Sequence, residues 1–488
     1  YFTDKRVEYS DDKSPKHEQI ISRYKLVPKN IKKYLKGELT EPVNPIVYYI
    51  DPNTPKKWIP YLIAGIEDWN QAFEAAGFKN AIQAKEWPND KDMSVDDARY
   101  CVLRYLPSET ENAYGPRIAD PRSGEIIESH VCWYHNVIAL LKKWYMTQCG
   151  PLDKRAQTMN MDDKLMGQLI RFVSSHEVGH TLGLRHNMGA SFATPVEKLR
   201  DKAWVEAHGH TVSIMDYARF NYVAQPEDGI SEKGLFPRIG DYDKWAIKWG
   251  YQYRPEFKNA KEEKDALRAE VTKKLTADLR LWFGGEGTNS DPRAQTEDLS
   301  DDNIKAASYG IKNMKRIMTN LEKWTYQPDG VTDDLSEIHH ELRSRLRLFL
   351  GHVQLHIIGK LDNSNIPNRP VKEYESKARQ KEAIQWIDDN IFTAPMWLYP
   401  EEICNKLGTD YKEEISDRQT GALTVMLTPN QIDNINDESM SNMKNPYTVQ
   451  EYLGDVFKAV WKQLTDKNDI QNDLRRSMQR TYIDLLGK

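Results

Sequence analysis

The chain has 488 residues, with 68 Lys and Arg against 73 Asp and Glu, a formal net charge of −5 and a mean hydropathy of −0.73. It has no long cationic run and so gives no sign of a nucleic-acid partner, and no stretch approaches the ~18 apolar residues needed to span a bilayer. Its length exceeds one ordinary hydrophobic core, so two domains are the default expectation.

The predicted elements begin after a polar, Lys-rich stretch at 1–44, which indicates a linker or the tail of an upstream segment. The apolar run at 46–50 predicts a short buried strand. Apolar residues that recur every three or four positions predict a helix that begins near Pro55 and ends at Gly77. Patterns typical of strands then follow at 81–87, 99–106 and 125–134.

Two helices are predicted next, at about 136–148 and 162–182. In the second helix an apolar stripe leads directly into His176 and His180. We expect one face of this helix to pack against the core and to become a polar site at its C-terminal end.

The segment that follows this stripe reads HEVGHTLGLRH and matches the pattern H-E-x-x-H-x-x-G-x-x-H at every fixed position. His176 and His180 are four residues apart, so on a helix they project from one face and can hold one Zn²⁺. Gly183 can adopt positive φ and turn the chain back, which brings in His186 as the third ligand. Three imidazoles leave the fourth position to water, as in catalytic zinc sites. Glu177 is offset around the helix and can reach that water as a general base.

A second feature is the sequence SIMDY at 213–217, a short turn with Met215 at its centre. The histidine motif and this turn, in this order, resemble the metzincin clan of zinc endopeptidases. The resemblance covers roughly residues 46–250. It implies an α+β fold, in which a twisted mixed sheet carries an active-site helix and a methionine turn, followed here by a mostly α-helical C-terminal region.

The resemblance also implies roles for residues around the turn. Met215 would pack beneath the imidazoles, where it and Gly183 are structural. Tyr217 has the place of a tyrosine that lies near the metal in astacins and serralysins, so we expect it to be catalytic; the alternative is a plain core tyrosine. The strand at 125–134 would form the edge of the sheet beside the zinc cleft, where an extended peptide adds itself by backbone hydrogen bonds.

More narrowly, GLRHN and SIMDYARFNYVAQPEDG resemble a group of secreted zinc metalloproteases of Bacteroidetes. This resemblance alone implies an extracytoplasmic location, whether periplasmic, surface-anchored or secreted. Asn187 departs from the astacin, serralysin, reprolysin and matrixin branches, which are distinguished by the residue after the third histidine. The substrate preference of those branches therefore cannot be transferred to this chain.

We expect three parts: a linker or tail at 1–44, a zinc metallopeptidase catalytic domain at 45–251, and a mostly helical region at 252–488. The last part contains no catalytic motif, so we expect it to support or wall the cleft and to contribute substrate selection and not chemistry. Its predicted helical stretches are 260–281, 302–324, 333–360, 370–390 and 447–485.

The sequence thus predicts a zinc-dependent endopeptidase that acts on a peptide or protein substrate. Glu177 would take a proton as water attacks the scissile carbonyl and deliver it to the leaving amine. The alternative is an inactive zincin-like module that binds a protein or a glycan, and the intact Glu177 argues against it. A metal-stabilised structural domain would need a fourth protein ligand, and the sequence places none.

Other candidate features have plainer interpretations. His208 and His210 precede the turn, and His352 and His356 are four apart on a predicted helix; exposed or packed roles are favoured for all four. The GGEG sequence at 284–287 follows a helix and lacks the frame of a nucleotide-binding loop. The four cysteines are Cys101, Cys132, Cys149 and Cys404. A Cys101–Cys132 or Cys132–Cys149 bridge and buried free thiols all stay open.

Overall fold

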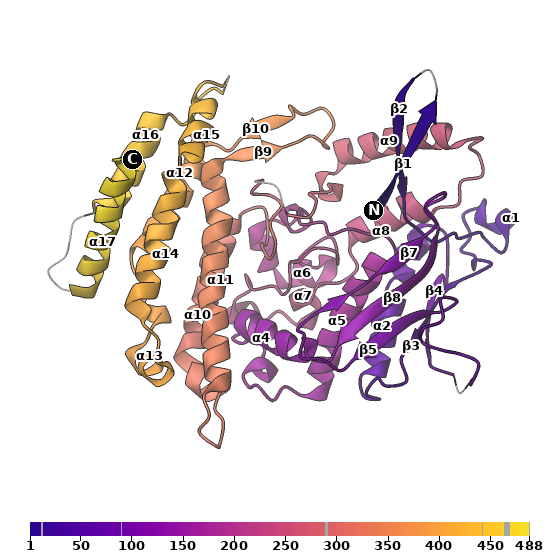
Figure 1. Ribbon diagram of the computed structural model, residues 1–488, viewed down its shortest axis with the longest axis horizontal. Helices are drawn as coiled ribbons and strands as arrows, with labels where there is room; N and C mark the ends of the chain where they lie inside the picture. The colour runs from indigo at the N-terminus through magenta and orange to yellow at the C-terminus, as the bar shows by residue number, and fades with distance from the viewer. Residues whose placement is uncertain (11–12, 89, 288–290, 442, 463–468, 488) are drawn as a thin grey trace.

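The computed structural model describes residues 1–10, 13–88, 90–287, 291–441, 443–462 and 469–487. It confirms the α+β class: a mixed sheet with its helices forms the first half of the molecule, and the chain beyond is mostly helical (Figure 1). The C-terminal helices stand side by side at the end of the molecule away from the sheet. None of the helices among the described residues has both the length and the apolar character of a membrane span.

The main sheet contains the four predicted strands and two unpredicted ones, in the order β4-β3-β5-β8-β6, with β7 also paired to β8. Their bounds are β3 Ile46–Ile50, β4 Ile82–Glu86, β5 Cys101–Leu106, β6 Ala113–Tyr114, β7 Arg117–Ala119 and β8 Ile126–Tyr134. The predicted strands β3, β4, β5 and β8 run parallel, whereas β6 and β7 run antiparallel to β8. A parallel sheet of this kind must be covered by helices.

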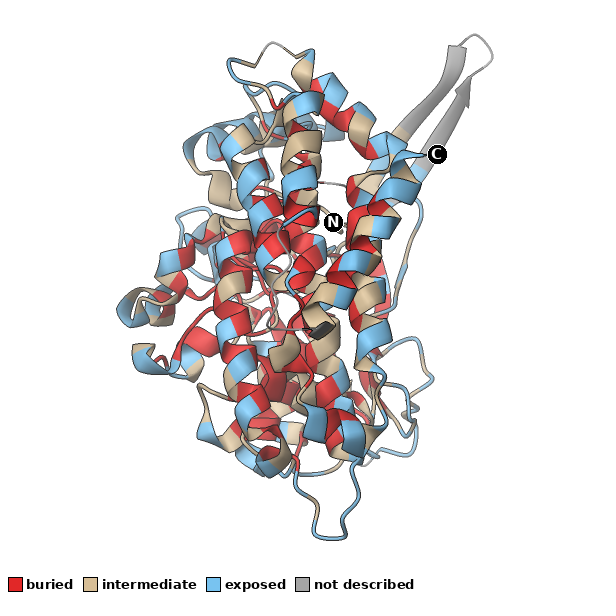
Figure 2. Cartoon of the chain, turned by 90° about the vertical axis from the view of Figure 1, so that its left-hand side faces the viewer, coloured by how far each residue is buried: buried red, intermediate tan, exposed pale blue. Residues whose placement is uncertain are grey.

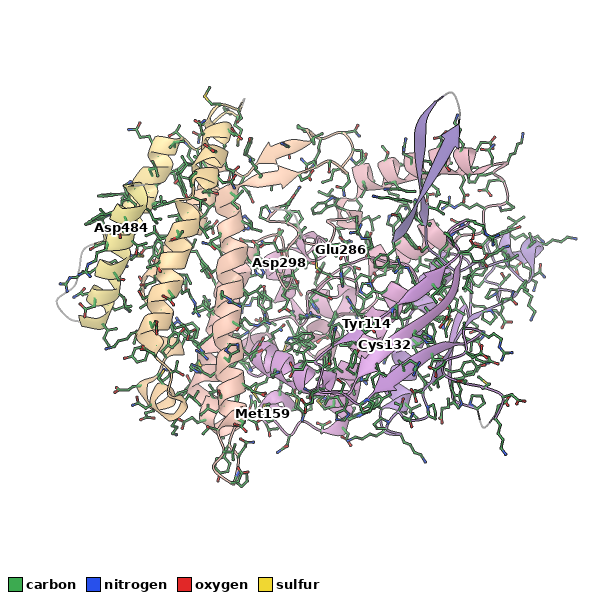
Figure 3. The ribbon with its side chains drawn as sticks, in the orientation of Figure 1. Tyr114, Cys132, Met159, Glu286, Asp298 and Asp484 are labelled. Carbon is green, nitrogen blue, oxygen red and sulfur yellow. The ribbon has the colours of Figure 1, made fainter. Side chains whose placement is uncertain are left out.

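The prediction that 125–134 forms the edge of the sheet is wrong. β8 pairs with β5 on one side and with β6 and β7 on the other, so its backbone groups are already used. The edge is instead the segment 113–119, whose two strands are too short to give a periodic signal. On this segment Tyr114 pairs with Cys132 of β8, as the labels in Figure 3 show.

The helix predicted between Pro55 and Gly77 is present but begins later and is interrupted, as α2 (Ile59–Glu67) and α3 (Asn70–Ala75). The helices predicted at 136–148 and 162–182 are α4 (Val137–Cys149) and α5 (Asp163–Thr181). The other helices of this half are α6 Lys202–His208, α7 Glu232–Leu235 and α8 Asp241–Tyr251. Single 3-10 turns lie at Lys154–Ala156, Ser191–Ala193, Val196–Leu199 and Pro226–Asp228.

The segment 1–44, for which composition suggests a linker, contains a hairpin and contacts the zinc-motif loop. Its elements are β1 Thr3–Ser10, β2 Lys13–Ile21 and α1 Ile31–Tyr34. The Phe2 amide donates a hydrogen bond to the Gly183 carbonyl oxygen at 2.7 Å, and Arg23 forms a bridge with Glu125. A polar hairpin has no apolar alternation, so its sequence looks like that of a linker.

The region after Tyr251 has more elements than the periodicity predicts. The predicted stretches contain α9 Ala260–Ala277, α10 Asn303–Trp324, α11 Asp333–Ile358, α12 Lys377–Ile387, α16 Val449–Val460 and α17 Asp469–Leu486. Residues 463–468 of the last predicted stretch lie outside the described part. The helix prediction is wrong at 372–374, which form the strand β10 Lys372–Tyr374 paired with β9 Lys360–Asp362. A 3-10 turn at Leu279–Leu281 and a π-helical turn at Asp388–Phe392 lie at the ends of predicted stretches. The elements outside the predicted stretches are α13 Glu401–Leu407, α14 Tyr411–Met426 and α15 Pro429–Ser439, with a 3-10 turn at Met396–Leu398.

One hydrophobic core joins the two halves. Buried residues of the sheet, of α4 and α5 and of the C-terminal helices belong to the same cluster. Gly150 at the end of α4 lies against Trp324 of α10, and the ring of Tyr222 lies 5.2 Å from that of Phe349 on α11. Figure 2 shows buried residues along one face of these helices and exposed ones along the other. This core crosses residue 251. The division of the chain into two domains at that residue therefore stays a prediction.

Candidate metal centre and active site

Helix α5 carries the first two histidines of the site at its C-terminal end. Its N-terminus is capped by the Asp162 side chain, which accepts a hydrogen bond from the Leu165 amide at 2.8 Å. His176 and His180 are one turn apart and meet His186, which the chain brings back after the helix. One ring nitrogen from each of the three histidines lies within 4.8 Å of the others. The structure therefore brings the three predicted ligands together.

Each imidazole of this cluster is held through its Nδ1 by a hydrogen-bond acceptor. The acceptor is a backbone carbonyl oxygen for the first two histidines and a carboxylate for the third. The pairs are His176 with Ile214 O at 2.7 Å, His180 with Leu184 O at 2.9 Å, and His186 with Glu286 Oε2 at 2.7 Å. Because an acceptor requires a proton on Nδ1, each Nε2 keeps its lone pair for a metal ion.

The three Nε2 atoms fit a zinc ion. The Nε2 of His176 is buried without a hydrogen-bond partner among the described residues, which is costly unless a ligand uses its lone pair. The Nε2 atoms of His180 and His186 lie 3.0 Å apart, where two neutral acceptors repel and a bound cation removes the repulsion. Burial, together with the neighbouring imidazoles, lowers the pKa of His176 well below its ordinary value and that of His180 to about 4. Both rings are thus neutral at pH 7, as metal ligands must be.

Gly183 makes the turn that returns the chain to the metal site, as predicted. Its φ of +90° lies in the left-handed region, where a side chain is strained. A Cβ at this position would also lie 2.0 Å from the Ser22 carbonyl oxygen. Glycine is therefore required both by the turn and by the close approach of the N-terminal segment.

Met215 lies directly beneath the site helix and is fully buried. At Gly179 the space for a side chain is filled by the Met215 sulfur, which would be 2.2 Å from an added Cβ. Asp243 of α8 fixes the turn: its carboxylate accepts hydrogen bonds from the Ser213 hydroxyl at 2.6 Å and the Ile214 amide at 2.7 Å. The same Ile214 supplies the carbonyl that holds His176, so the turn and the first ligand form one unit.

Glu177 directly follows His176 on α5, and the ring of Tyr217 lies against those of His176 and His186. Glu177 is 7% exposed, and burial raises the pKa of its carboxyl group to about 8, an effect that the charge of Arg219 opposes. The ring of Tyr217 lies 4.4 Å from that of His186, and burial raises the pKa of its hydroxyl above the ordinary value. The arrangement offers a buried carboxyl group and a phenol next to three free imidazole nitrogens.

Arg219 belongs to the site but lies outside the histidine motif and the methionine turn. Its guanidinium lies between two rings, 4.0 Å from the centre of Tyr217 and 3.9 Å from that of Trp144. Its backbone has a φ of +53°, and its carbonyl oxygen lies 3.2 Å from the Nε2 of His210. Glu297 pairs with its Nε at 3.2 Å. A backbone conformation of this kind is strained and persists only where surrounding contacts hold it. The contacts with Trp144, His210 and Glu297 hold Arg219, and its guanidinium in turn fixes the ring of Tyr217.

Asn187 and Glu286 are two further residues whose contacts at the site the sequence did not indicate. Asn187 is buried and bonds the segment at 282–284, while Glu286 accepts hydrogen bonds from His186 and, at 2.8 Å, from the Nε of Arg185. In the view of Figure 3, Glu286 lies between the sheet and α11, in the middle of the molecule. The third histidine is thus supported from the region beyond residue 251.

A family model described as Met-zincin matches residues 158–468, well over half of the chain. The chain belongs to the Met-zincin family. No curated protein and no solved structure matches it significantly. The matched range includes the histidine motif, the methionine turn and most of the helical region. Membership supports a metalloprotease-type enzyme and implies that the Met-zincin histidines bind zinc.

The remaining histidine candidates of the sequence are not members of the Met-zincin histidine cluster. His208 is exposed and stacks on Trp204, and His210 is buried beside Arg219. His352 and His356 are buried. The Nε2 of His352 is hydrogen-bonded to the Thr296 carbonyl oxygen, and both ring nitrogens of His356 have partners, Glu375 and the Asn303 side chain. The four cysteines, all within the described part, are free thiols.

Proposed function

We propose that this Met-zincin is a zinc-dependent endopeptidase. The observation that carries the proposal is the convergence of three Nε2 atoms, each on a ring fixed through Nδ1, next to the buried carboxyl group of Glu177. A site that only stored metal or stabilised the fold would gain nothing from a buried carboxyl group at this position, and would call for a fourth protein ligand. Among the described residues the histidine cluster has three members.

In this proposal the chain supplies the proton transfers and the orientation of the peptide. When bound, zinc would act as a Lewis acid for the scissile carbonyl and would lower the pKa of water. The raised pKa of Glu177 would fall beside the positive charge of bound zinc, which favours the ionised form of the carboxyl group. Glu177 then takes the proton of the attacking water and passes it to the leaving amine. The Tyr217 hydroxyl donates a hydrogen bond to the oxygen on which negative charge develops. Arg219, packed on the ring of Tyr217, keeps that hydroxyl in place.

The substrate is proposed to bind as an extended peptide along the segment 113–119. This segment is the outer edge of the sheet, and Gly115 lies against α5, where an added Cβ would be 2.7 Å from the Glu177 carbonyl oxygen. A peptide that pairs with this edge passes close to the histidine cluster. Backbone pairing sets the register of the peptide, and side-chain preference is left to the pockets.

The deciding experiment combines metal analysis with a peptide-library digest read by mass spectrometry. Zinc-loaded protein should cleave within peptides, and Glu177→Ala should keep near-stoichiometric zinc while losing activity by about 10²–10⁴-fold, because Glu177 is a base and not a ligand. Glu74→Ala, at an exposed position of α3, serves as the control. Substantial turnover by metal-loaded Glu177→Ala would contradict the assignment. A zinc-loaded protein that cleaves nothing would favour the binding module.

We also propose an extracytoplasmic location, on the resemblance to secreted zinc metalloproteases. The four free thiols do not indicate a compartment, since buried free cysteines occur on both sides of the membrane. Fractionation of the producing cell, with immunodetection of the native chain, tests the location.

A further inference from the structure

The GGEG sequence at 284–287 lies beside the third histidine and is fastened there by Asn187. The Oδ1 of Asn187 accepts a hydrogen bond from the Gly284 amide at 2.8 Å, and its Nδ2 donates one to the Trp282 carbonyl oxygen at 3.0 Å. The next residue, Met188, donates its amide to the Gly285 carbonyl oxygen at 2.9 Å. The residues directly after His186 thus bind the loop that directly precedes Glu286.

The geometry of the loop explains why each of its three glycines is a glycine. An added Cβ at Gly284 would lie 2.6 Å from the backbone nitrogen and Cα of Gly189, so the two backbones are in direct contact. Gly285 and Gly287 have φ values of +84° and +69°, which favour glycine. The sequence is therefore not a nucleotide-binding loop but a tight connection that presents the one side chain between its glycines.

That side chain, Glu286, bonds a metal ligand. Its two carboxylate oxygens lie 2.7 Å from the Nδ1 of His186 and 2.8 Å from the Nε of Arg185, and its side chain is 23% exposed. His176 and His180 are held by backbone carbonyls from the first half of the chain. His186 is the one member of the cluster that is held by a charged group, and that group comes from beyond residue 251.

We propose that Glu286 is a positioning residue for the zinc site, an inference that rests on the proposed function. It keeps the proton of His186 on Nδ1 and turns the ring so that Nε2 faces the other two nitrogens. A carboxylate in this place also makes the imidazole a stronger donor to the metal, and loss of such a partner typically costs ~10–100-fold in metal affinity. The C-terminal region thus completes the metal centre without supplying a ligand.

The test compares the zinc affinities of Glu286→Gln and Glu286→Ala with that of the unchanged chain, by competition with a chromophoric chelator and without substrate. Glu375→Gln is the matched control, because Glu375 accepts a hydrogen bond from His356 at 2.8 Å in the same way but away from the cluster. We expect affinity to fall in the order Glu, Gln, Ala, by about 10–100-fold for Ala. The Gln side chain can still accept the hydrogen bond but lacks the charge, and the control should bind zinc like the unchanged chain.

Two further readings separate positioning from a general loss of structure. Co²⁺ in place of zinc should give an altered absorption spectrum in the Ala variant and not in the control, and excess zinc should restore a large part of any lost peptidase activity. If Glu286→Gln and Glu286→Ala bind zinc and give Co²⁺ spectra like the unchanged chain, the proposal is overturned. If the Glu286→Ala variant does not fold, the Glu286→Gln variant decides the test by itself. A zinc affinity and a Co²⁺ spectrum like those of the unchanged chain would then overturn the proposal. An unchanged chain that binds zinc but cleaves no peptide would contradict the proposed function and leave this comparison valid.

Discussion

Tyr217 is the residue for which the geometry makes the most specific kinetic prediction. Its ring lies 4.4 Å from that of His186, under a guanidinium 4.0 Å away. A phenol held there can donate a hydrogen bond to an oxyanion, and removal of one such donor typically costs ~10²–10³ in kcat. Tyr217→Phe should therefore lower kcat by this order with little change in KM or zinc content, because the interaction strengthens only in the transition state.

Steady-state kinetics of the zinc-loaded variants would measure this effect. Tyr326→Phe is a suitable control, since Tyr326 is 74% exposed. Full kcat in the Tyr217→Phe variant, or a loss of activity explained by unfolding alone, would make Tyr217 a packing residue. The oxyanion would then depend on the metal and on other donors.

His186 is predicted to be the third ligand, and its removal should be visible in metal binding alone. In His186→Ala two imidazoles remain, so zinc affinity should drop sharply, by more than the ~10–100-fold expected for loss of a supporting contact. A zinc titration beside His208→Ala, which changes an exposed histidine, provides the comparison. Unchanged affinity in His186→Ala would mean that another residue completes the site.

The sequence predicted the parts of the site that are local and missed those that depend on distant contacts. The three histidines and Glu177 lie within one eleven-residue motif, and helical spacing alone places two of them on one face. Glu286 lies 100 residues from His186, and nothing in GGEG indicates which turn of the chain it will meet. Asn187 was recognisable as a departure from other branches, but its role depends on a loop that only folding brings to it.

At the scale of elements, the contact between α5 and the methionine turn is the one most open to test. The Met215 sulfur and the Trp69 ring would lie 2.2 and 2.7 Å from an added Cβ at Gly179. Gly179→Ala must therefore displace Met215 or the helix, and overpacking of this kind costs about 1–3 kcal/mol. We expect a lower thermal midpoint and weaker zinc binding, because the same turn holds His176 through Ile214.

Gly421→Ala is the matched control for this change. Gly421 lies inside helix α14, and an added Cβ there meets nothing within 4 Å. Alanine in an open helical position should stabilise by about 1 kcal/mol, through helix propensity. Calorimetry of both variants should give shifts of opposite sign. A Gly179→Ala variant as stable as the unchanged chain would show that the turn yields easily and does not support the site.

The elements that the sequence predicted correctly are those with a strong apolar period. β3, β4, β5 and β8 and the long helices α5, α10 and α11 fall close to their predicted ranges. The missed strands have weak patterns: β1 and β2 are polar, and β6 and β7 have two and three residues. The helices α13, α14 and α15 were also missed. The error about the sheet edge follows directly, since a strand that is not detected leaves its neighbour looking unpaired.

At the scale of the whole molecule, the catalytic half depends on the helices that follow it. Asn313 of α10 donates hydrogen bonds from its Nδ2 to the carbonyl oxygens of Tyr222 and Ala224, at 3.0 and 2.8 Å, just after the methionine turn. Arg345 of α11 pairs with Glu297 at 2.9 Å, and the same carboxylate pairs with Arg219 of the site. The two guanidinium groups hold the pKa of Glu297 below its ordinary value although burial acts to raise it. The carboxylate therefore stays charged and links the C-terminal region to Tyr217.

A chain that ends at Tyr251 should consequently fail to form a stable zinc-binding domain. It would lose the acceptor of His186 and would expose the apolar faces of α4 and of the segment around Tyr222 that now lie against α10 and α11. Exposed apolar surface costs roughly 25 cal/mol per Å², so uncovering about 400 Å² would cost about 10 kcal/mol, which is comparable with the stability of an ordinary domain. Near-ultraviolet circular dichroism and a zinc titration of residues 1–251, beside the full chain, measure both effects. We expect the full chain to unfold in one transition that zinc shifts upward, and the short chain to show neither fixed aromatic packing nor tight zinc binding. Cooperative melting of the short chain with the zinc affinity of the full one would show that the helical region is an independent addition.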